Sequence, residues 1–361
     1  MRFWPLMLLA VIGIILYEQQ PAWIVARMPE PTVIPTRSAV SYLADADIAY
    51  RSGKIDQAIA AYEQVMRLEP TNPKPLAALS ALYLLLQDLD KSYELAQKAV
   101  ALAPRDVESL NALARIENWR NQNEAAIQHA FTAQEIEPQN ATTLAILAEI
   151  YVDEGNWWIA DDYLTQALEI DPQNVTALRN RAYWHELQGD YELAIAYYDQ
   201  AIAAAPYRFD LYIGKGRQYR VGMLDFEQAN AAYRQAVAAY ESPVTLDALG
   251  DGLYNAMDYL GAVETLRRAV ELDPNYGPAL VHLGMAYYAR RNYEDSARYL
   301  EEGLEILGDR ARIEQIYTAG LAHIFKDPPE CDRAEPYLRR ALEIHSGATP
   351  ASEGLRMCNL P

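Results

Sequence analysis

Proline recurs at a fixed interval of 34 residues through the middle of this chain of 361 residues. The five evenly spaced prolines are Pro70, Pro104, Pro138, Pro172 and Pro206. Each follows a segment that is similar from one repeat to the next, as in Leu-Glu-Ile-Asp before Pro172. Proline ends a helix because it lacks an amide hydrogen and its ring clashes with the preceding turn. A helical unit of 34 residues therefore repeats, and such units stack side by side instead of surrounding one central core.

Small side chains keep the same period at two places in each unit. In the first half of the units they are Ala46, Ser80, Ala114, Ala148, Ala182, Gly216, Gly250, Gly284 and Gly320. In the second half they are Ala58, Ser92, Ala126, Ala160, Ala194, Ala229, Ala262, Ala297 and Ala334. Small residues at fixed places let two helix axes approach closely, and Gly or Asn between the halves can end the first helix. Each unit is therefore predicted to be a pair of antiparallel helices.

The pattern resembles the tetratricopeptide repeat, whose small, aromatic and proline positions match this chain over residues 39–345. We count nine units. The resemblance implies an all-α fold, a right-handed superhelical solenoid in which the first helix of each pair lines a concave surface. Because each pair buries its apolar face only against its neighbours, we expect stability to be a sum of nearest-neighbour terms.

Three departures from the repeat are visible. One residue is inserted within 221–225, and the segment Tyr240 to Pro243 replaces the usual Asp-Pro stop. The ninth unit has a lengthened internal turn at 326–330. We expect this last unit to act as a cap, followed by a C-terminal tail at 346–361.

The chain begins with an uncharged apolar segment, residues 3–17, between Arg2 and Glu18. As a helix it would extend roughly 22 Å, which is short for a hydrocarbon core of about 30 Å. Small residues suited to signal cleavage are missing just after it. We expect 1–20 to be a single-pass membrane anchor and 21–38 a proline-rich spacer. A cleaved signal peptide and a buried soluble helix are the alternatives.

The distribution of charge predicts the location and excludes one class of partner. Arg2 precedes the apolar segment, so the positive-inside rule places the repeats outside the cytoplasm. The chain carries 31 Lys and Arg against 50 Asp and Glu, a net charge of −19. Such acidity argues against binding to nucleic acid.

No pattern of catalytic or metal-binding residues is found in the sequence. The five histidines are scattered over different units, and Gly214 to Gly216 lacks the Lys-Ser or Lys-Thr pair of a phosphate loop. We therefore expect no enzymatic activity, no cofactor and no metal. Cys331 and Cys358 are spaced so that a disulfide would fold the tail back, which an oxidising compartment would allow. Two separate thiols are the alternative.

Polar and aromatic residues follow the predicted inner face of the first helices. Projecting each helix at steps of three and four residues gives a candidate partner-binding groove of Asn111, Arg115, Asn118, Trp119, Glu149, Arg179, Tyr183, Glu186, Arg217, Arg220, Asp247, Asp251, Tyr254 and Tyr288. The aromatic members can anchor a partner or simply pack.

Three arginines of the candidate groove belong to neighbouring units. Arg179, Arg217 and Arg220 can converge on a carboxylate or an acidic peptide through bidentate contacts. Alternatively, acidic residues of the same face neutralise them in ion pairs: Glu149, Glu186 and Asp247.

Together these features predict a bacterial, membrane-anchored, extracytoplasmic scaffold that binds a protein or peptide partner, or assembles a membrane complex, through its concave groove. Three alternatives stay open. The chain can be a secreted or periplasmic protein that binds peptides or an envelope polymer, an accessory subunit of an envelope enzyme, or a cytoplasmic co-chaperone.

Overall fold

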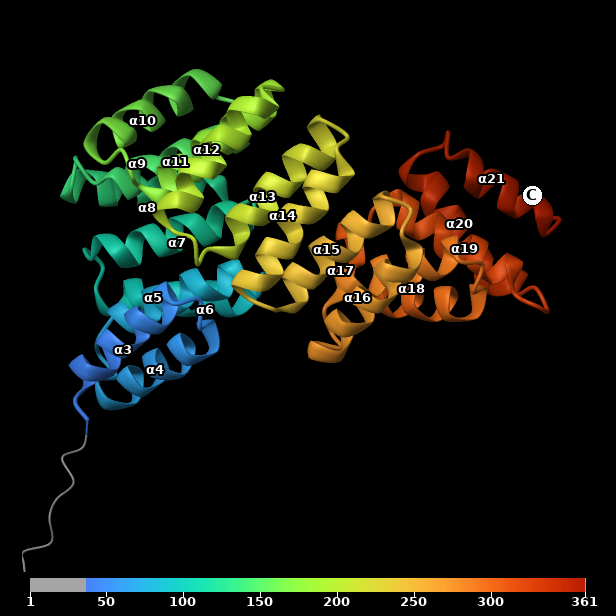
Figure 1. The fold of residues 1–361 in the computed structure, drawn as a ribbon, viewed down its shortest axis with the longest axis horizontal. Coiled ribbons are helices and arrows are strands. Elements are labelled where there is room, and N and C mark those ends of the chain that lie inside the picture. Colours follow the sequence, from blue (N-terminus) through green and yellow to red (C-terminus); the bar gives the residue numbers. More distant parts are fainter. Residues whose placement is uncertain (1–36, 361) are drawn as a thin grey trace, which may run out of the picture.

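The computed structural model describes residues 37–360, and these residues form an all-helical chain (Figure 1). The predicted anchor at 1–20 lies outside the described residues, as does nearly all of the predicted spacer. Within residues 37–360, every helix is too short or too polar to cross a bilayer.

Nineteen α-helices and two shorter helical segments make up the described part of the chain. Their bounds are α3 (Ala39–Arg51), α4 (Ile55–Leu68), α5 (Lys74–Leu85), α6 (Leu89–Leu102), α7 (Val107–Trp119), α8 (Asn123–Ile136), α9 (Ala141–Asp153), α10 (Trp157–Ile170), α11 (Val175–Gln188), α12 (Tyr191–Ala204), α13 (Phe209–Arg217), η1 (Gln218–Gly222), α14 (Phe226–Ala239), α15 (Pro243–Asn255), α16 (Tyr259–Leu272), α17 (Gly277–Ala289), α18 (Tyr293–Leu307), η2 (Gly308–Arg310), α19 (Ile313–Phe325), α20 (Cys331–Ile344) and α21 (Thr349–Met357). Consecutive helices from α3 to α20 pack as nine pairs, which we call units 1 to 9.

A residue with positive φ separates the two helices in eight of the nine units. These residues are Gly53, Gln87, Asn121, Gly155, Gly189, Leu224, Met257 and Arg291. The left-handed conformation ends the first helix and turns the chain toward the second. Glycine adopts it without strain, whereas a side chain such as Met257 raises its cost by about 1 kcal/mol.

The periodic small residues lie where two helices of a unit touch. A Cβ added to Gly250 on α15 would come within 2.4 Å of Leu266 Cγ on α16. A Cβ added to Gly284 on α17 would lie 2.6 Å from Leu300 Cγ and 3.1 Å from the Ser296 carbonyl oxygen on α18. The close approach of the paired helices therefore depends on the small side chains that set the period.

The inserted residue in unit 6 is absorbed by a π-helical turn. The segment η1 continues directly from α13, and its wider turn takes up one extra residue without ending the helix. As a result, Leu224 follows Gly189 by one residue more than the period requires. The unusual start of unit 7 is stabilised by a capping box, in which Ser242 and Thr245 each bond the other's backbone amide.

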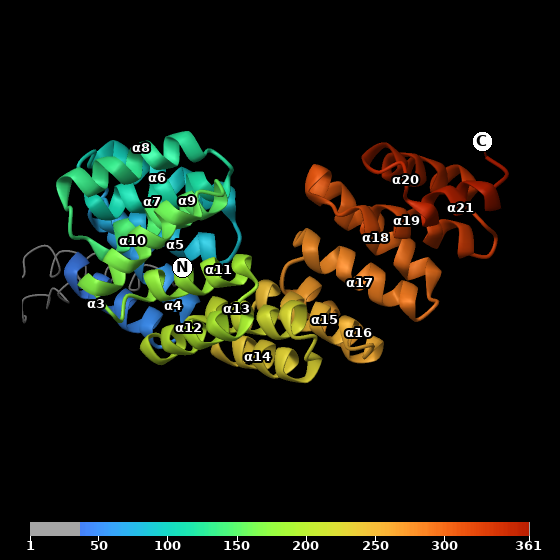
Figure 2. The same ribbon diagram turned by 90° about the horizontal axis from the view of Figure 1, so that it is seen from above.

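The first units close against units 6 and 7, which the sequence analysis did not expect. In Figure 2, α3 to α14 form a compact group from which the later helices extend. The Tyr240 hydroxyl donates to Asp56 Oδ1 at 2.8 Å, and the rings of Tyr50 and Tyr207 lie 5.1 Å apart. Stability is therefore not a sum of nearest-neighbour terms alone.

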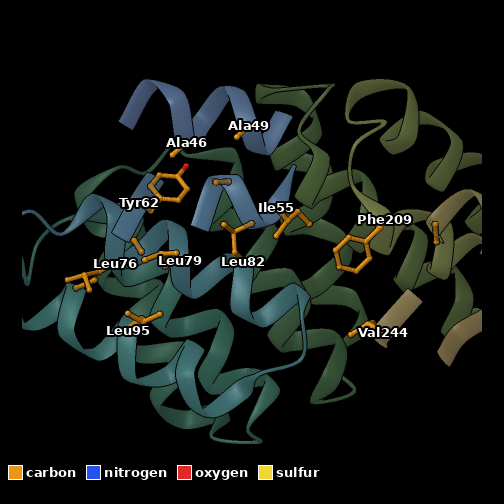
Figure 3. Close-up of a cluster of buried hydrophobic side chains, with 14 residues drawn as sticks. Ala46, Ala49, Ile55, Tyr62, Leu76, Leu79, Leu82, Leu95, Phe209 and Val244 are labelled. Atoms are coloured by element: carbon orange, nitrogen blue, oxygen red, sulfur yellow. The ribbon is translucent and has the colours of Figure 1, made fainter. Parts of the chain in front are cut away.

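One apolar cluster spans this closure (Figure 3). Phe209 of unit 6 and Val244 of unit 7 share it with Ile55 and Leu79 of the first two units, and all four side chains are buried. Phe209 is 1% exposed, so its ring is removed from water almost completely. We call units 1 to 6 with the start of α15 the closed ring.

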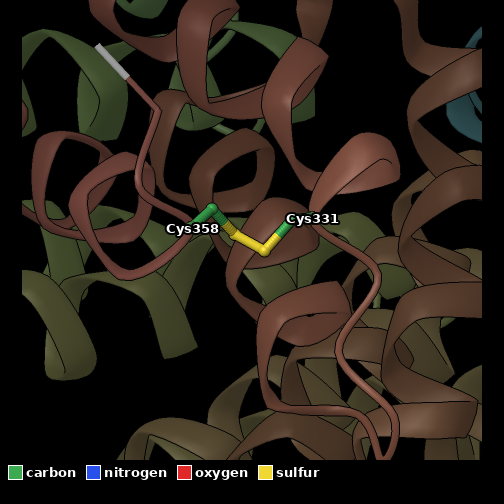
Figure 4. The surroundings of a disulfide bond; sticks show 2 residues. All are labelled: Cys331 and Cys358. Carbon is green, nitrogen blue, oxygen red and sulfur yellow. A yellow bond between two sulfur atoms is a disulfide. The ribbon is translucent and has the colours of Figure 1, made fainter.

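The C-terminal tail is ordered and helical. Helix α21 packs on α19 and α20, and it buries Ala351 and Leu355 against the last unit. A disulfide joins Cys331 at the start of α20 to Cys358 just after α21, with the Cα atoms 5.6 Å apart (Figure 4). The apolar end of the solenoid is thus covered by α21, while unit 9 is a complete helix pair.

Candidate partner-binding surfaces

The residues of the candidate groove do not line one continuous surface. Arg115, Trp119, Arg179 and Arg217 line one hollow, together with residues of unit 2 and Val244 of α15. Arg220, Asp251 and Tyr254 line another, beside α17 and the start of α19. The structure therefore divides the predicted groove into two separate sites.

Glu149 of α9 lies at the centre of a cluster of polar side chains from α7, α9 and α11. It accepts hydrogen bonds from Arg179 Nη1 at 2.7 Å and Trp119 Nε1 at 3.1 Å. Asn180 Nδ2 donates to it at 3.2 Å, and Arg115 Nε lies 3.4 Å away. Burial alone would raise the pKa of Glu149, but Arg179 and Arg115 outweigh it and lower the pKa to about 2. Glu149 is therefore ionised.

A second carboxylate, that of the exposed residue Asp153, lies one helical turn further along α9. It accepts hydrogen bonds from Asn118 Nδ2 at 2.6 Å and from the Tyr183 hydroxyl at 2.9 Å. Burial raises the pKa of Asp153 above its usual range, although both hydrogen bonds oppose that shift. Asn111 is buried, and its Oδ1 has no hydrogen-bond partner among the described residues.

Unit 6 contributes two further ion pairs. Arg217 Nη2 donates to Glu186 Oε2 at 2.7 Å, and Gln218 Nε2 donates to the same oxygen at 2.7 Å. Arg208 makes a bidentate contact with Asp210, at 2.6 and 2.7 Å. The sequence analysis missed this last pair because both residues lie at the start of α13, outside the projected face.

Each of the three arginines proposed to converge on a ligand contacts a carboxylate of this chain. Arg179 pairs with Glu149 and Arg217 with Glu186, while Arg220 Nη1 lies 3.5 Å from Asp251. Arg179 and Arg217 face the closed ring, whereas Arg220 faces the open site. The three side chains therefore do not share one space.

The closed ring contains a cavity of about 120 Å³, which we call the ring cavity. Its lining residues are Leu84, Leu85, Gln87, Arg115, Trp119, Arg179, Tyr198, Phe209, Asp210, Ile213, Gly214, Arg217 and Val244. Helices from both ends of the ring contribute, so the cavity exists only because the first units meet units 6 and 7.

The open site is a groove of about 130 Å³, which we call the C-terminal groove. It is lined by Arg220, Asp251, Tyr254, Asn255, His282, Met285, Arg312 and Glu314. Arg312 and Glu314 are exposed at one side of it. The remaining lining residues are half-buried, so the groove offers both apolar and charged contacts.

Aromatic side chains extend this groove along α17 and α19. The ring of Tyr288 lies 5.5 Å from that of Tyr293 and 6.3 Å from that of Phe325. Phe325 remains 40% exposed. The Tyr254 ring packs 5.6 Å from that of Tyr259. These rings hold one another in place and still present surface to solvent.

His282 connects two helices at the floor of the C-terminal groove. Its Nδ1 lies 2.7 Å from Asp247 Oδ1, and its Nε2 lies 3.1 Å from Arg312 Nη2. Arginine can only donate, so Nε2 accepts and Nδ1–H donates to Asp247. Burial lowers the pKa of His282, but the carboxylates of Asp247 and Asp251 outweigh it and the pKa lies above its usual value. Sequence reasoning treated this histidine as isolated.

Within residues 37–360, the structure contains no group of three or more His, Cys, Asp or Glu side chains arranged to hold a metal ion.

Comparison with known families gives one consistent result. Two models described as tetratricopeptide repeat match the chain, one at residues 147–209 and the other at residues 49–116 and 253–319. These matches together cover more than half of the chain. No curated protein matches the sequence.

Solved structures with the same fold share little sequence with this chain. The Cut9 and Hcn1 hetero-tetramer of the APC/C aligns with a TM-score of 0.67 at 16% identity, over 89% of this chain and 63% of that one. This chain thus spans less than two thirds of that relative's length. The human IFIT1 dimer with PPP-AAAA aligns with a TM-score of 0.54 at 15% identity, over 84% and 82% of the two chains.

Proposed function

Because this chain belongs to the tetratricopeptide repeat family, whose members bind protein or peptide partners, we propose that it is a membrane-tethered scaffold holding an extended segment of a partner protein in its C-terminal groove. The repeats would stand outside the cytoplasm, joined to the membrane by residues 3–17 and the spacer at 21–38.

The observation that carries this proposal is the mixed apolar and charged lining of the C-terminal groove. The ring cavity differs in its lining, which includes Arg115, Arg179 and Arg217. The C-terminal groove combines Tyr254 and Met285 with the exposed charges of Arg312 and Glu314, and the half-buried Tyr288 lies one turn further along the helix of Met285. Large aromatic residues give contact area at low entropic cost, which favours a peptide with apolar anchors flanked by polar groups.

The disulfide between Cys331 and Cys358 supports the proposed location. Structural disulfides persist in oxidising compartments and are rare in the cytoplasm. This bond fixes α21 onto the last unit. Its presence agrees with the positive-inside orientation of the apolar N-terminal segment.

Photo-crosslinking in intact membranes tests the binding site. A photoreactive amino acid replacing Tyr254 should give a discrete crosslinked product, because this side chain lines the groove. The control position is Arg298, an exposed side chain on α18, the second helix of unit 8, that does not line the groove. Equal products from both positions, or none from Tyr254, would rule out the groove as the binding surface.

Fractionation tests the tether separately. The full chain should remain with the membrane after high-salt washing, and its intact mass should include residues 1–20. A mature protein that starts after residue 20 and is found in the soluble extracytoplasmic fraction would instead identify a secreted or periplasmic binding protein. Copurification with an envelope enzyme would identify an accessory subunit.

A further inference from the structure

The ring cavity holds a cluster of cationic groups that partner binding at the C-terminal groove does not use. Arg115 of α7, Arg179 of α11 and Arg217 of α13 all line it. The Arg115 and Arg179 side chains are 14% and 17% exposed, so both charges lie largely inside the protein, whereas the Arg217 side chain is 42% exposed. Placing three guanidinium groups around one small cavity is electrostatically costly unless anions balance them.

These guanidinium groups leave most of their donors unused. A guanidinium has five N–H donors. Arg179 donates to Glu149 and to Asn180, and Arg217 donates once to Glu186. Arg115 makes no hydrogen bond within the described residues, and its nearest acceptor is Glu149, 3.4 Å from Nε. The buried Nε atoms of Arg115 and Arg217 have no hydrogen-bond partner there.

The neighbouring carboxylates are already engaged. The single negative charge of Glu149 is shared between Arg115 and Arg179, so it does not balance both positive charges. Asp210 lines the cavity, but its two oxygens are both taken by Arg208. Burial lowers the pKa of Arg115, although Glu149 opposes this, and Arg179 and Arg208 lower it further. Arg115 is thus a buried cation with an incomplete set of anionic partners.

Asp153 is the remaining acid near this cluster, and it does not line the cavity. Its two oxygens accept hydrogen bonds from Asn118 and Tyr183, so both are engaged by groups other than Arg115.

We propose that the ring cavity binds a small oxyanion, a phosphate or carboxylate group, between Arg115, Arg179 and Arg217. A volume of about 120 Å³ corresponds to roughly four water molecules, which is enough for one such group and too small for a polymer. The rings of Trp119 and Phe209 form apolar walls, so charge-assisted hydrogen bonds inside the cavity are strengthened. The anion is either a free ion or the terminal group of a slender molecule.

Isothermal titration calorimetry of the full chain with inorganic phosphate and with acetate tests this site. We expect saturable binding of at least one of them with one site per chain. Arg115→Gln should weaken it at least tenfold, because charge-assisted hydrogen bonds to the anion are lost. The matched control is Arg298→Gln, which removes an exposed arginine paired with Asp295 and should bind like the wild type.

Arg115→Lys covers the case in which Arg115→Gln does not fold. Lysine keeps the charge but lacks the planar fork, so binding should weaken less than with glutamine and remain measurable. Titration with glycerol phosphate separates the two sources of the anion: binding as tight as that of inorganic phosphate indicates a terminal group, and weaker binding indicates a free ion. The proposal fails if the wild type shows no saturable binding of phosphate or acetate, or if the Arg115 variants and Arg298→Gln bind equally well.

Discussion

Gly53 gives a direct test of whether the first unit closes against the sixth. This residue ends α3 with φ +72°, and a Cβ added to it would lie 2.9 Å from the carbonyl oxygen of Ala239 at the end of α14. Gly155 and Gly189 occupy the same place in units 4 and 5, with φ +76° and +79°. A Cβ at either position would meet no atom within 4 Å. The three glycines therefore differ only in what lies across from them.

The expected decrease in the free energy of unfolding of each variant is the sum of up to two separate costs. Alanine in the left-handed conformation costs about 1 kcal/mol at all three positions. Gly53→Ala adds a contact with backbone that has to move by several tenths of an ångström, and overpacking of this kind costs about 1–3 kcal/mol. We therefore expect Gly155→Ala and Gly189→Ala to destabilise by about 1 kcal/mol, and Gly53→Ala by about 2–4 kcal/mol.

Urea unfolding followed by circular dichroism measures these losses, and hydrogen exchange shows where they occur. For Gly53→Ala, the amides of α14 should exchange faster, although they lie far away in the sequence. Small-angle scattering should show an expanded molecule for this variant alone. Equal losses for all three variants, with unchanged exchange in α14, would refute the closure of the ring.

Four further results are expected. Phe209→Ala should cost about 3–5 kcal/mol in urea unfolding and speed hydrogen exchange in α3 and α4, since the ring fills the closure. Folding lowers the pKa of Glu149 to about 2, so its ionised carboxylate stabilises the folded protein fully above about pH 5. This stabilisation is lost as the pH falls toward 2. In pH-dependent unfolding, the wild type should therefore lose about 3 kcal/mol more than Glu149→Gln over this range. Replacing Cys331 and Cys358 by serine removes a crosslink over 27 residues and should cost roughly 3–4 kcal/mol, seen as faster exchange in α21. Met257 is exposed and has φ +63°, so Met257→Gly removes the cost of holding a side chain in the left-handed conformation. The melting temperature should rise by an amount equivalent to about 1 kcal/mol.

The helix pairs could be predicted from the sequence because their causes are local and repeated. Prolines such as Pro172 and glycines such as Gly155 fix where helices end, and small residues such as Gly284 fix where they touch. Each cause recurs once per unit, so the period makes it visible. The interactions that end these helices and pair them join residues within about 30 positions of one another. They can therefore be predicted without knowing how distant units are arranged.

Closure of the ring could not be predicted because its contacts join residues that no period relates. Tyr240 and Asp56 are 184 residues apart. A clue was nevertheless present, because Tyr240 stands where the period places a proline. Its hydroxyl reaches Asp56, and the irregular start of α15 places Val244 in the shared core. In this chain, departures from the repeat thus mark positions that make contacts between units far apart in the sequence.

The candidate groove was predicted as one continuous surface, whereas the structure places its residues around two separate hollows. Projection along a helix identifies the face that a side chain occupies, and it contains no information on what covers that face. Arg115 and Arg220 were both projected onto the inner face of the first helices, yet the first lines the ring cavity and the second the C-terminal groove. The contact of Arg312 with His282 was missed because Arg312 precedes its helix.

The distance in sequence between the two sides of the ring also affects how the chain is made. The contact between Asp56 and Tyr240 requires 184 further residues to be synthesised after Asp56. At the usual rate of about 5–20 residues per second, this takes about 10–40 s. During that interval Ala49 and Ile55 lack the partners that units 6 and 7 supply, so this apolar cluster stays incomplete until Phe209 and Val244 have been made.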